Sequence, residues 1–150
     1  MDQAIVVAVR SGLSVALRSM VDDDKPFIFA TWLRGYRSSS PSVDKVSSAT
    51  YFAAQHRRIA RLLQTSNVIV AVLPDAPAVI VGYAVVEVRG TTAVIHWAHV
   101  KGSWQRLGVA RRMLEGLDAS RCVFTHLTKS AAGLMRRFPG LTFNPYLLEE

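Results

Sequence analysis

Hydrophobic positions near the N-terminus follow a strand pattern first and a helix pattern afterwards. Two short β-rich runs, "AIVVAV" and "LSVALRSMV", are separated only by "RSG" and predict a hairpin. A helix is expected within "DDDKPFIFATWLRGYR", because Asp23 or Asp24 can cap its start and Pro26 suits its first turn. The apolar face of this helix is predicted to carry Phe27, Ala30 and Leu33.

A loop and a second helix follow. The stretch "SSSPSVDK" is the most loop-like part of the chain, because Ser, Pro and Asp favour turns. The next helix is expected to begin at Ser47 or Ser48 and to end near Gln64. Its apolar face is predicted to consist of Phe52, Ile59 and Leu63, with Arg57, Arg58 and Arg61 roughly opposite.

Three strands come next, in "NVIVAVL", "AVIVGYAVVEVR" and "TTAVIHWAHV". A helix over 109–117, a strand "CVFTHL", a helix "SAAGLMRRF" and an extended piece "LTFNPYLLE" complete the chain. This order predicts an α/β fold with a mixed sheet that is mostly antiparallel. The 150 residues, half of them hydrophobic, predict one domain over 1–150, with 1–13 as an N-terminal extension or an extra strand.

Composition narrows the function only slightly. The net charge of +7 favours an anionic partner such as nucleic acid, phosphate, a membrane surface or CoA, but it equally fits an ordinary basic surface. The single cysteine excludes an intramolecular disulfide, and the acidic start lacks the basic region of a signal peptide. No apolar run approaches the roughly 20 residues of a membrane span. We therefore expect a cytoplasmic protein without membrane contact.

The four histidines, His56, His96, His99 and His126, show no metal-ligand spacing, so no metal is expected. The segment "KGSWQRLGVARRML" is more informative, because it joins a strand to a helix through a turn that holds a glycine, several donors and no acid. The first turn of a helix offers unpaired N–H groups and a partial positive charge, and a glycine lets a phosphate approach the backbone. The turn is thus suited to a pyrophosphate.

The longer segment "HVKGSWQRLGVARRML" resembles the acyl-CoA-binding segment of the GCN5-related N-acetyltransferase (GNAT) family, whose Arg/Gln-x-x-Gly-x-Gly/Ala pattern is matched by Gln105, Gly108 and Ala110. Further similarity lies in "VALRSMVDDD", "VIVGYAVVEV" and "AAGLMRRFPGLTF", so the match runs from about Ser14 to the C-terminus. The resemblance implies a mostly antiparallel, twisted sheet of six to seven strands that splays after the fourth core strand, with about four helices.

The resemblance also implies acetyl-CoA as co-substrate and assigns it a binding segment. The backbone at the end of the splayed strand would pair with the pantetheine arm, and the following turn would hold the pyrophosphate. The residues concerned are Ala98, His99 and Val100 for the arm and Gln105, Arg106, Leu107, Gly108, Val109 and Ala110 for the pyrophosphate.

A GNAT reaction needs a base that takes a proton from the attacking amine, and His96 and Glu87 are the candidates. Strict alternation along the strand would put His96 on the opposite face from Ile95, Trp97 and His99, and Glu87 on the face of Tyr83 and Val85. A strand histidine can equally be a structural, hydrogen-bonded residue, and Glu87 can simply be solvated.

The last predicted helix differs from the family pattern. Met135 and Arg136 straddle the position where the family often has a tyrosine that acts as general acid. The main hypothesis is an acyl-CoA-dependent N-acyltransferase that acts on a small-molecule or peptide amine by direct attack. A catalytically weak or inactive CoA-binding module is the alternative. A basic nucleic-acid-binding protein is disfavoured, because no basic stripe with interleaved aromatic residues is present. A homodimer is left open.

Overall fold

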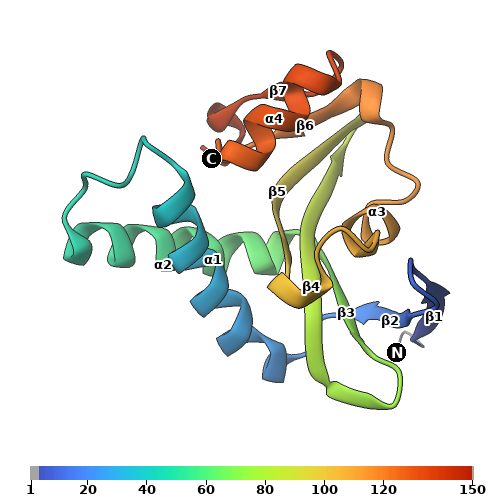
Figure 1. Ribbon diagram of the computed structural model, residues 1–150. Helices are drawn as coiled ribbons and strands as arrows, with labels where there is room; N and C mark the ends of the chain where they lie inside the picture. The colour runs from blue at the N-terminus through green and yellow to red at the C-terminus, as the bar shows by residue number, and fades with distance from the viewer. Residues whose placement is uncertain (1–3, 150) are drawn as a thin grey trace.

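The structure, a computed structural model, describes residues 4–149 and contains one seven-stranded sheet whose strands follow sequence order (Figure 1). The strands are β1 (Ile5–Ala8), β2 (Ser14–Ser19), β3 (Asn67–Leu73), β4 (Ala76–Arg89), β5 (Thr92–Val100), β6 (Cys122–Phe124) and β7 (Thr142–Phe143). The helices are α1 (Lys25–Ser39), α2 (Ser48–Thr65), α3 (Val109–Met113) and α4 (Lys129–Arg137). Short 3₁₀ turns lie at Asp22–Asp24, Gly102–Trp104, Ala119–Arg121 and Pro145–Leu148.

The strand directions confirm the mixed sheet expected from the sequence. β1 to β5 are antiparallel neighbours, whereas β6 pairs parallel to β5 and β7 parallel to β6. Parallel neighbours need a crossover connection, and α3 and α4 provide the two crossovers. The hairpin predicted from the first two β-rich runs is also present as β1 and β2.

Helices cover both faces of the sheet, α1 and α2 on one side and α3 on the other (Figure 1). Trp32 of α1, Ile59 of α2 and Tyr83 of β4 are fully buried in the first apolar layer. Val109 and Met113 of α3 pack with Ala84 in the second layer. Burial on both faces explains why β4 and β5 read as nearly continuous apolar runs rather than as alternating ones.

Several predicted boundaries differ from the structure. The helix expected over 109–117 ends at Met113, β6 ends at Phe124 because the chain bends, and the C-terminal piece forms a two-residue strand and a 3₁₀ turn. Phe52 was expected on the buried face of α2, but 46 % of it is exposed. It lies near the start of α2 and faces a groove beside α1 instead of the sheet.

β5 contains a bulge at His96. Val85 pairs with Trp97 and Val86 pairs with Ile95, so His96 has no partner of its own on β4. The extra residue breaks the alternation of side chains: Ile95 packs on the α3 side, whereas Trp97 packs on the side of α1 and α2. The expectation that Ile95 and Trp97 share a face is therefore wrong.

The sheet opens between β5 and β6. Only Ala93, Val94 and Ile95 of β5 pair with β6, and one further hydrogen bond joins Thr125 N–H to the Ile95 carbonyl. From His96 to Val100, β5 has no strand partner on this side among the described residues. This opening, here called the wedge, confirms the splay expected after the fourth core strand. Within residues 4–149, no helix combines the length and apolar character of a membrane span.

Candidate functional site

The end of β5 presents free backbone groups to the wedge. A Cβ placed on Gly82 would lie 2.7 Å from the carbonyl oxygen of His99, so that carbonyl points toward β4. Because the backbone groups of successive strand residues point to opposite edges, Ala98 and Val100 direct their N–H and C=O groups into the wedge. The Val100 carbonyl already accepts a hydrogen bond from Gln105 Nε2 at 3.0 Å. The wedge edge of β5 can thus pair with an extended ligand.

The turn before α3 has the backbone form that its glycine predicts. Gly108 stands at the N-cap of α3 with φ +91°, and no atom lies within 4 Å of the place where its Cβ would be. Arg106 also has a positive φ, of 66°. Arg10 supports this turn, because its N–H donates to the Leu107 carbonyl and its guanidinium to the Arg106 carbonyl. The hairpin of β1 and β2 therefore fixes the position of this turn through the two hydrogen bonds of Arg10.

A groove of about 1320 Å³ runs from this turn along α3 and α4. Its apolar walls include Ile95, Leu107, Phe124, Leu134 and Phe138, and its charged residues are Arg10, Arg111, Arg112, Arg137 and Glu115. This α3–α4 groove is large enough for a drug-sized or cofactor-sized molecule. With four arginines and one glutamate in its lining, the groove is positively charged and suited to bind an anion.

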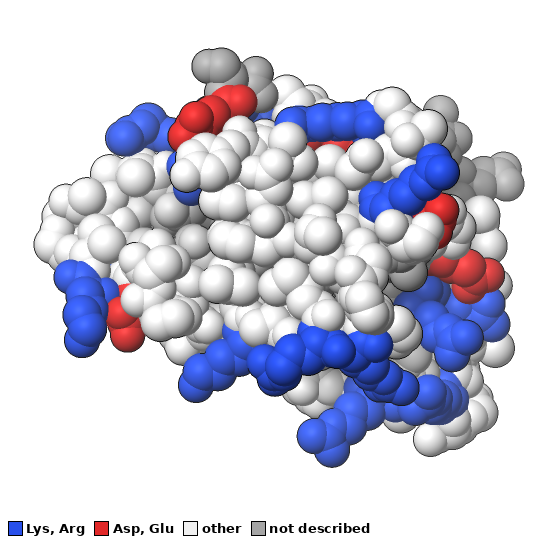
Figure 2. Space-filling view, turned by 90° about the horizontal axis from the view of Figure 1, so that it is seen from above, with Lys and Arg blue, Asp and Glu red and all other residues white. Residues whose placement is uncertain are grey.

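Basic side chains are also concentrated on the outer surface. Lys and Arg gather along one side of the face seen in Figure 2, with few acidic side chains between them. This arrangement agrees with the net charge of +7. A surface of one sign attracts an anionic ligand from a distance and accelerates its encounter with the protein.

His96 and Glu87, the two predicted catalytic residues, are in direct contact. His96 Nε2 lies 2.5 Å from Glu87 Oε2, and His96 Nδ1 lies 2.9 Å from the hydroxyl of Thr125. Arg89 donates to the same Glu87 oxygen at 2.9 Å. The His96 side chain is completely buried, whereas 17 % of the Glu87 side chain is exposed. Both ring nitrogens of His96 are thus occupied, and no substrate atom can touch them in this arrangement.

The environment fixes the charges of this pair. Burial works to raise the pKa of Glu87, but hydrogen bonds from His96 and Arg89 outweigh it, and the pKa is lowered from its ordinary value. Burial, with the charges of Arg89 and Arg61, lowers the pKa of His96, and together they outweigh the neighbouring Glu87, which acts to raise it. At neutral pH, Glu87 is therefore a carboxylate and His96 is neutral.

The hydrogen-bonded chain continues into an aromatic cluster. Thr125 Oγ1 lies 3.0 Å from Nδ1 of His126, whose ring packs against Trp32, Tyr36 and Trp97 with centroid distances of 5.5, 4.8 and 6.1 Å. Burial above all lowers the pKa of His126 to about 3. Three buried nitrogen atoms in this cluster have no hydrogen-bond partner: Trp32 Nε1, Trp97 Nε1 and His126 Nε2.

His99 faces the helices rather than the wedge. Its ring lies 5.9 Å from that of Phe27 and 5.6 Å from that of Tyr83, measured between centroids. Burial and then the charge of Arg34 lower the pKa of His99. Tyr83 has its hydroxyl bonded to Thr31 and to the Ile28 carbonyl, and burial raises its pKa. Tyr83 is a core residue and has no proton ready for a departing group.

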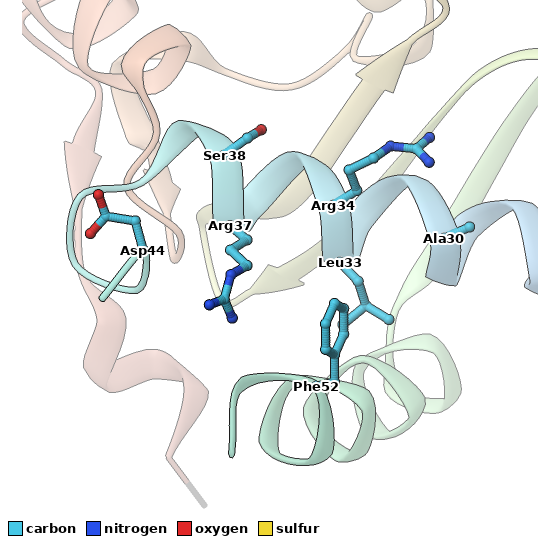
Figure 3. A pocket seen from close by; sticks show the side chains of 7 residues that line it. All are labelled: Ala30, Leu33, Arg34, Arg37, Ser38, Asp44 and Phe52. Carbon is cyan, nitrogen blue, oxygen red and sulfur yellow. The ribbon is translucent and has the colours of Figure 1, made fainter. Parts of the chain in front are cut away.

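A second groove, of about 630 Å³, lies between α1 and α2. Leu33 and Phe52 meet across it, Arg37 reaches down beside them, and Asp44 comes from the loop after α1 (Figure 3). Arg37 Nη2 donates to the Val46 carbonyl at 2.8 Å, but its buried Nη1 has no partner. This α1–α2 groove thus combines an apolar floor with the positive charges of Arg34 and Arg37.

The sequence argument missed Thr125 and His126. They stand at the bend after β6, and their contact with His96 depends on the pairing of β5 with β6. A polar pair directly after a short apolar strand, "CVF", was the available signal. Among residues 4–149, no three His, Cys, Asp or Glu side chains come together as metal ligands.

Neither protein-family models nor curated proteins match the chain. A cAMP-binding acyltransferase from Mycobacterium smegmatis superposes on 91% of this chain and 42% of its own, with TM-score 0.50 and 21% identity. The protein yncA of Salmonella typhimurium is described as an acetyltransferase and was solved with its cofactor acetyl-CoA. It superposes on 71% of this chain and 62% of its own, with TM-score 0.45 and 19% identity. A protein from Deinococcus radiodurans, also described as an acetyltransferase, superposes on 83% of this chain and 80% of its own, with TM-score 0.47 and 12% identity.

This chain therefore spans less than two thirds of the Salmonella and Mycobacterium proteins. The superposition on the acyltransferase, the mixed seven-stranded sheet and the wedge after β5 agree with one another. The chain has the GNAT acetyltransferase fold.

Proposed function

We propose that the protein is an acyl-CoA-dependent N-acyltransferase that transfers an acetyl group from acetyl-CoA to an amine. One observation carries the proposal: the free edge of β5 leads directly to the turn at Gly108 and into the arginine-lined α3–α4 groove. An extended arm and a phosphorylated nucleotide, the two halves of CoA, suit these two neighbouring surfaces.

In this proposal, CoA is held mostly by the backbone. Ala98 and Val100 would pair with the pantetheine arm, and their N–H groups lie where a carbonyl oxygen that gains negative charge could be stabilised. The turn would receive the pyrophosphate, and Arg10, Arg111 and Arg112 would balance its charge. The backbone of Gln105, Arg106, Leu107, Gly108, Val109 and Ala110 is the proposed pyrophosphate site, and His99 contributes only its place in the strand.

His96 and Glu87 remain the proposed acid–base pair, with an indirect role. His96 is enclosed and fully hydrogen-bonded, so it can act on the amine only through another group. Glu87 keeps a carboxylate with a partly exposed side chain, which makes it the natural final acceptor of a proton. In the reaction, His96 and Glu87 would thus take up the proton that the amine loses.

The acceptor would be a small-molecule or peptide amine bound from the side of α1 and α2. The α1–α2 groove is linked to the end of β5 through Arg34, which lines the groove and whose charge lowers the pKa of His99. Arg34 and Arg37 in the groove favour an acceptor that carries a carboxylate or another anionic group besides its amine. Asp44 at the rim can attract the amine itself before it loses its proton.

A thermal shift measurement tests the proposal. Acetyl-CoA at about 100 times its dissociation constant should add about 2.7 kcal/mol to the free energy of unfolding, which for a chain of this size raises Tm by roughly 5–10 °C. Inorganic pyrophosphate at equal ionic strength is the control, and its effect should be much smaller. An unchanged Tm with millimolar acetyl-CoA would remove both the cofactor and the enzyme from the proposal.

A CoA-binding module without turnover is the second candidate. The stacked rings of Trp32 and Trp97, with centroids 5.6 Å apart, fill the side of the wedge that faces α1. They leave little room for an acceptor amine there, which favours a module that binds CoA without turnover. A panel of amines separates the two candidates. Release of CoA thiol with any member supports the enzyme, whereas binding of acetyl-CoA without release from the whole panel supports the module.

A further inference from the structure

The hydrogen-bonded chain that begins at Glu87 ends at a ring nitrogen without a partner. Contacts of 2.5, 2.9 and 3.0 Å link Glu87 to His96, His96 to Thr125 and Thr125 to His126. The last polar atom, His126 Nε2, has no partner, although only 3 % of His126 is exposed. An unpaired buried polar atom destabilises a fold, so one that persists calls for an explanation.

The charge of Glu87 fixes the direction of each hydrogen bond. A carboxylate only accepts, so the shared proton sits on His96 Nε2. Neutral His96 then accepts at Nδ1 from the hydroxyl of Thr125, and the Thr125 oxygen accepts from Nδ1–H of His126. His126 Nε2 is therefore a free lone pair, the form that a proton acceptor needs.

His126 lies at the closed end of the wedge. It follows β6 by two residues, and the preceding Thr125 makes the last hydrogen bond between the two diverging strands, to Ile95. Its ring meets that of Trp97 at nearly right angles, and Trp97 directly precedes Ala98. The proposed site of the thioester, beside Ala98, is therefore next to the residues that enclose His126.

We propose that His126 accepts the proton of the attacking amine through one water molecule, because its Nε2 is enclosed, and that Thr125, His96 and Glu87 pass a proton on to solvent. The inference rests on the function proposed above. As the amine nitrogen bonds to the thioester carbon, the carbon–sulfur bond breaks and the CoA thiolate leaves with the electron pair. The ammonium proton passes to the water molecule, which gives one of its own protons to His126 Nε2. His126 Nδ1–H, the Thr125 hydroxyl and His96 Nε2–H each donate one proton along the chain, and Glu87 releases the last one to water.

Charged groups around the chain prevent a positive charge from resting on it. Burial and then the charges of His96 and Arg58 lower the pKa of His126, and Arg89 and Arg61 act in the same direction on His96. Glu87 is the single carboxylate in direct hydrogen-bond contact with His96 in the described part of the chain. The proton is therefore passed on to Glu87. The groups that face His126 from α1 are the rings of Trp32 and Tyr36.

Two substitutions of nearly equal shape test the relay. Thr125→Val removes the hydroxyl between the histidines and keeps the size of the side chain, whereas Thr125→Ser keeps the hydroxyl. With the amine that gives the highest turnover, Thr125→Val should lower kcat about tenfold or more, and His126→Gln by about 10²–10⁴, the usual range for general acid–base catalysis. The Kd of acetyl-CoA should not change, and Thr125→Ser should restore the kcat and pH profile of the unaltered chain. Folded Thr125→Val and His126→Gln proteins with unaltered kcat and pH profile would overturn the relay.

Nuclear magnetic resonance of the histidine rings gives a readout that does not depend on turnover. The spectrum should show His126 neutral near pH 7 with its proton on Nδ1, and Thr125→Val should shift both ring nitrogens of His96. A proton on Nε2 of His126 would overturn the relay even if the enzyme is active. An absence of acetyl-CoA binding would instead remove the proposed function, so the two failures are distinguishable.

Discussion

Gly82 of β4 leaves room for the carbonyl group of His99 on β5: a Cβ at residue 82 would stand 2.7 Å from the His99 oxygen and 3.4 Å from Cα of Val100. Real Cβ atoms do not come so close to backbone, so β5 can keep its position only while residue 82 is a glycine. The free edge at Ala98 and Val100 thus depends on a residue of the neighbouring strand.

Gly82→Ala should therefore push the end of β5 away from β4. We expect a loss of about 1–3 kcal/mol in the free energy of unfolding, the usual cost of overpacking, and a clear drop in acetyl-CoA affinity. Gly102→Ala is the matched control, because nothing lies within 4 Å of the added Cβ. Denaturant titration and calorimetry measure the two effects. Wild-type affinity in a folded Gly82→Ala protein would contradict the proposed pairing of CoA with this edge.

Gly108→Glu should weaken acetyl-CoA binding more than tenfold, because it places a negative charge and a bulky side chain where the pyrophosphate is expected. The positive φ of +91° adds a strain of about 1–2 kcal/mol. Gly90→Glu is the matched control, since Gly90 also has a positive φ and open space around it but lies in the turn between β4 and β5. Equal losses of affinity in both variants would show that general strain or charge, and not the pyrophosphate site, explains the effect.

The free energy of unfolding should decrease as the pH falls below about 6.5. Burial lowers the folded-state pKa of His96, His99 and His126, the last to about 3. Below the unfolded-state value of about 6.5, the unfolded chain therefore binds protons that the native chain does not, at a cost of about 1.4 kcal/mol per pH unit for each proton. The carboxylates of Asp24 and Glu87, whose pKa values are also lowered, add to the loss only below about pH 4.5.

Urea titrations between pH 7.5 and 4.5 measure this slope. His126→Gln should reduce it by close to one proton, whereas His56→Gln, which alters an exposed histidine of α2, should leave it unchanged. A free energy of unfolding that stays constant between pH 6.5 and 4.5 would show that these histidines take up protons in the folded state.

Arg34→Gln should raise KM for an acceptor that carries a carboxylate several-fold and leave KM for a neutral amine unchanged, because Arg34 is proposed to hold the anionic group in the α1–α2 groove. Arg57→Gln removes the same charge from the exposed face of α2 and serves as control. Steady-state kinetics with matched pairs of acceptors, with and without the carboxylate, provide the measurement. Equal KM changes for both members of a pair would rule out this recognition.

The sequence was sufficient for the features that depend on local pattern. The β1–β2 hairpin follows from two apolar runs and a short turn, and the positive φ at Gly108 agrees with a glycine between a strand and a helix. The end of α3 could not be placed, because Leu114 and Leu117 continue its apolar pattern, and the polar residues Thr125 and His126 after β6 fit a longer strand as well as a bend.

The bulge at His96 had no local signal, because β5 is buried on both faces and its sequence shows no alternation to interrupt. The contact between Glu87 and His96 could be suspected from two polar residues on adjacent strands. The connection to His126 could not, since 29 residues separate His96 from Thr125 and only the parallel pairing of β5 with β6 brings them together.

A bulge is a one-residue insertion, and this gives β5 an unusual evolutionary freedom. Removing His96 would restore regular alternation and leave Ile95 and Trp97 on the faces they occupy now, because consecutive strand residues point to opposite faces of the sheet. The row of backbone N–H and C=O groups along the strand would survive such a deletion, because it does not depend on side-chain identity. Loss of the inserted residue would therefore remove the contacts of His96 with Glu87 and Thr125, while the strand edge proposed to hold CoA stays the same.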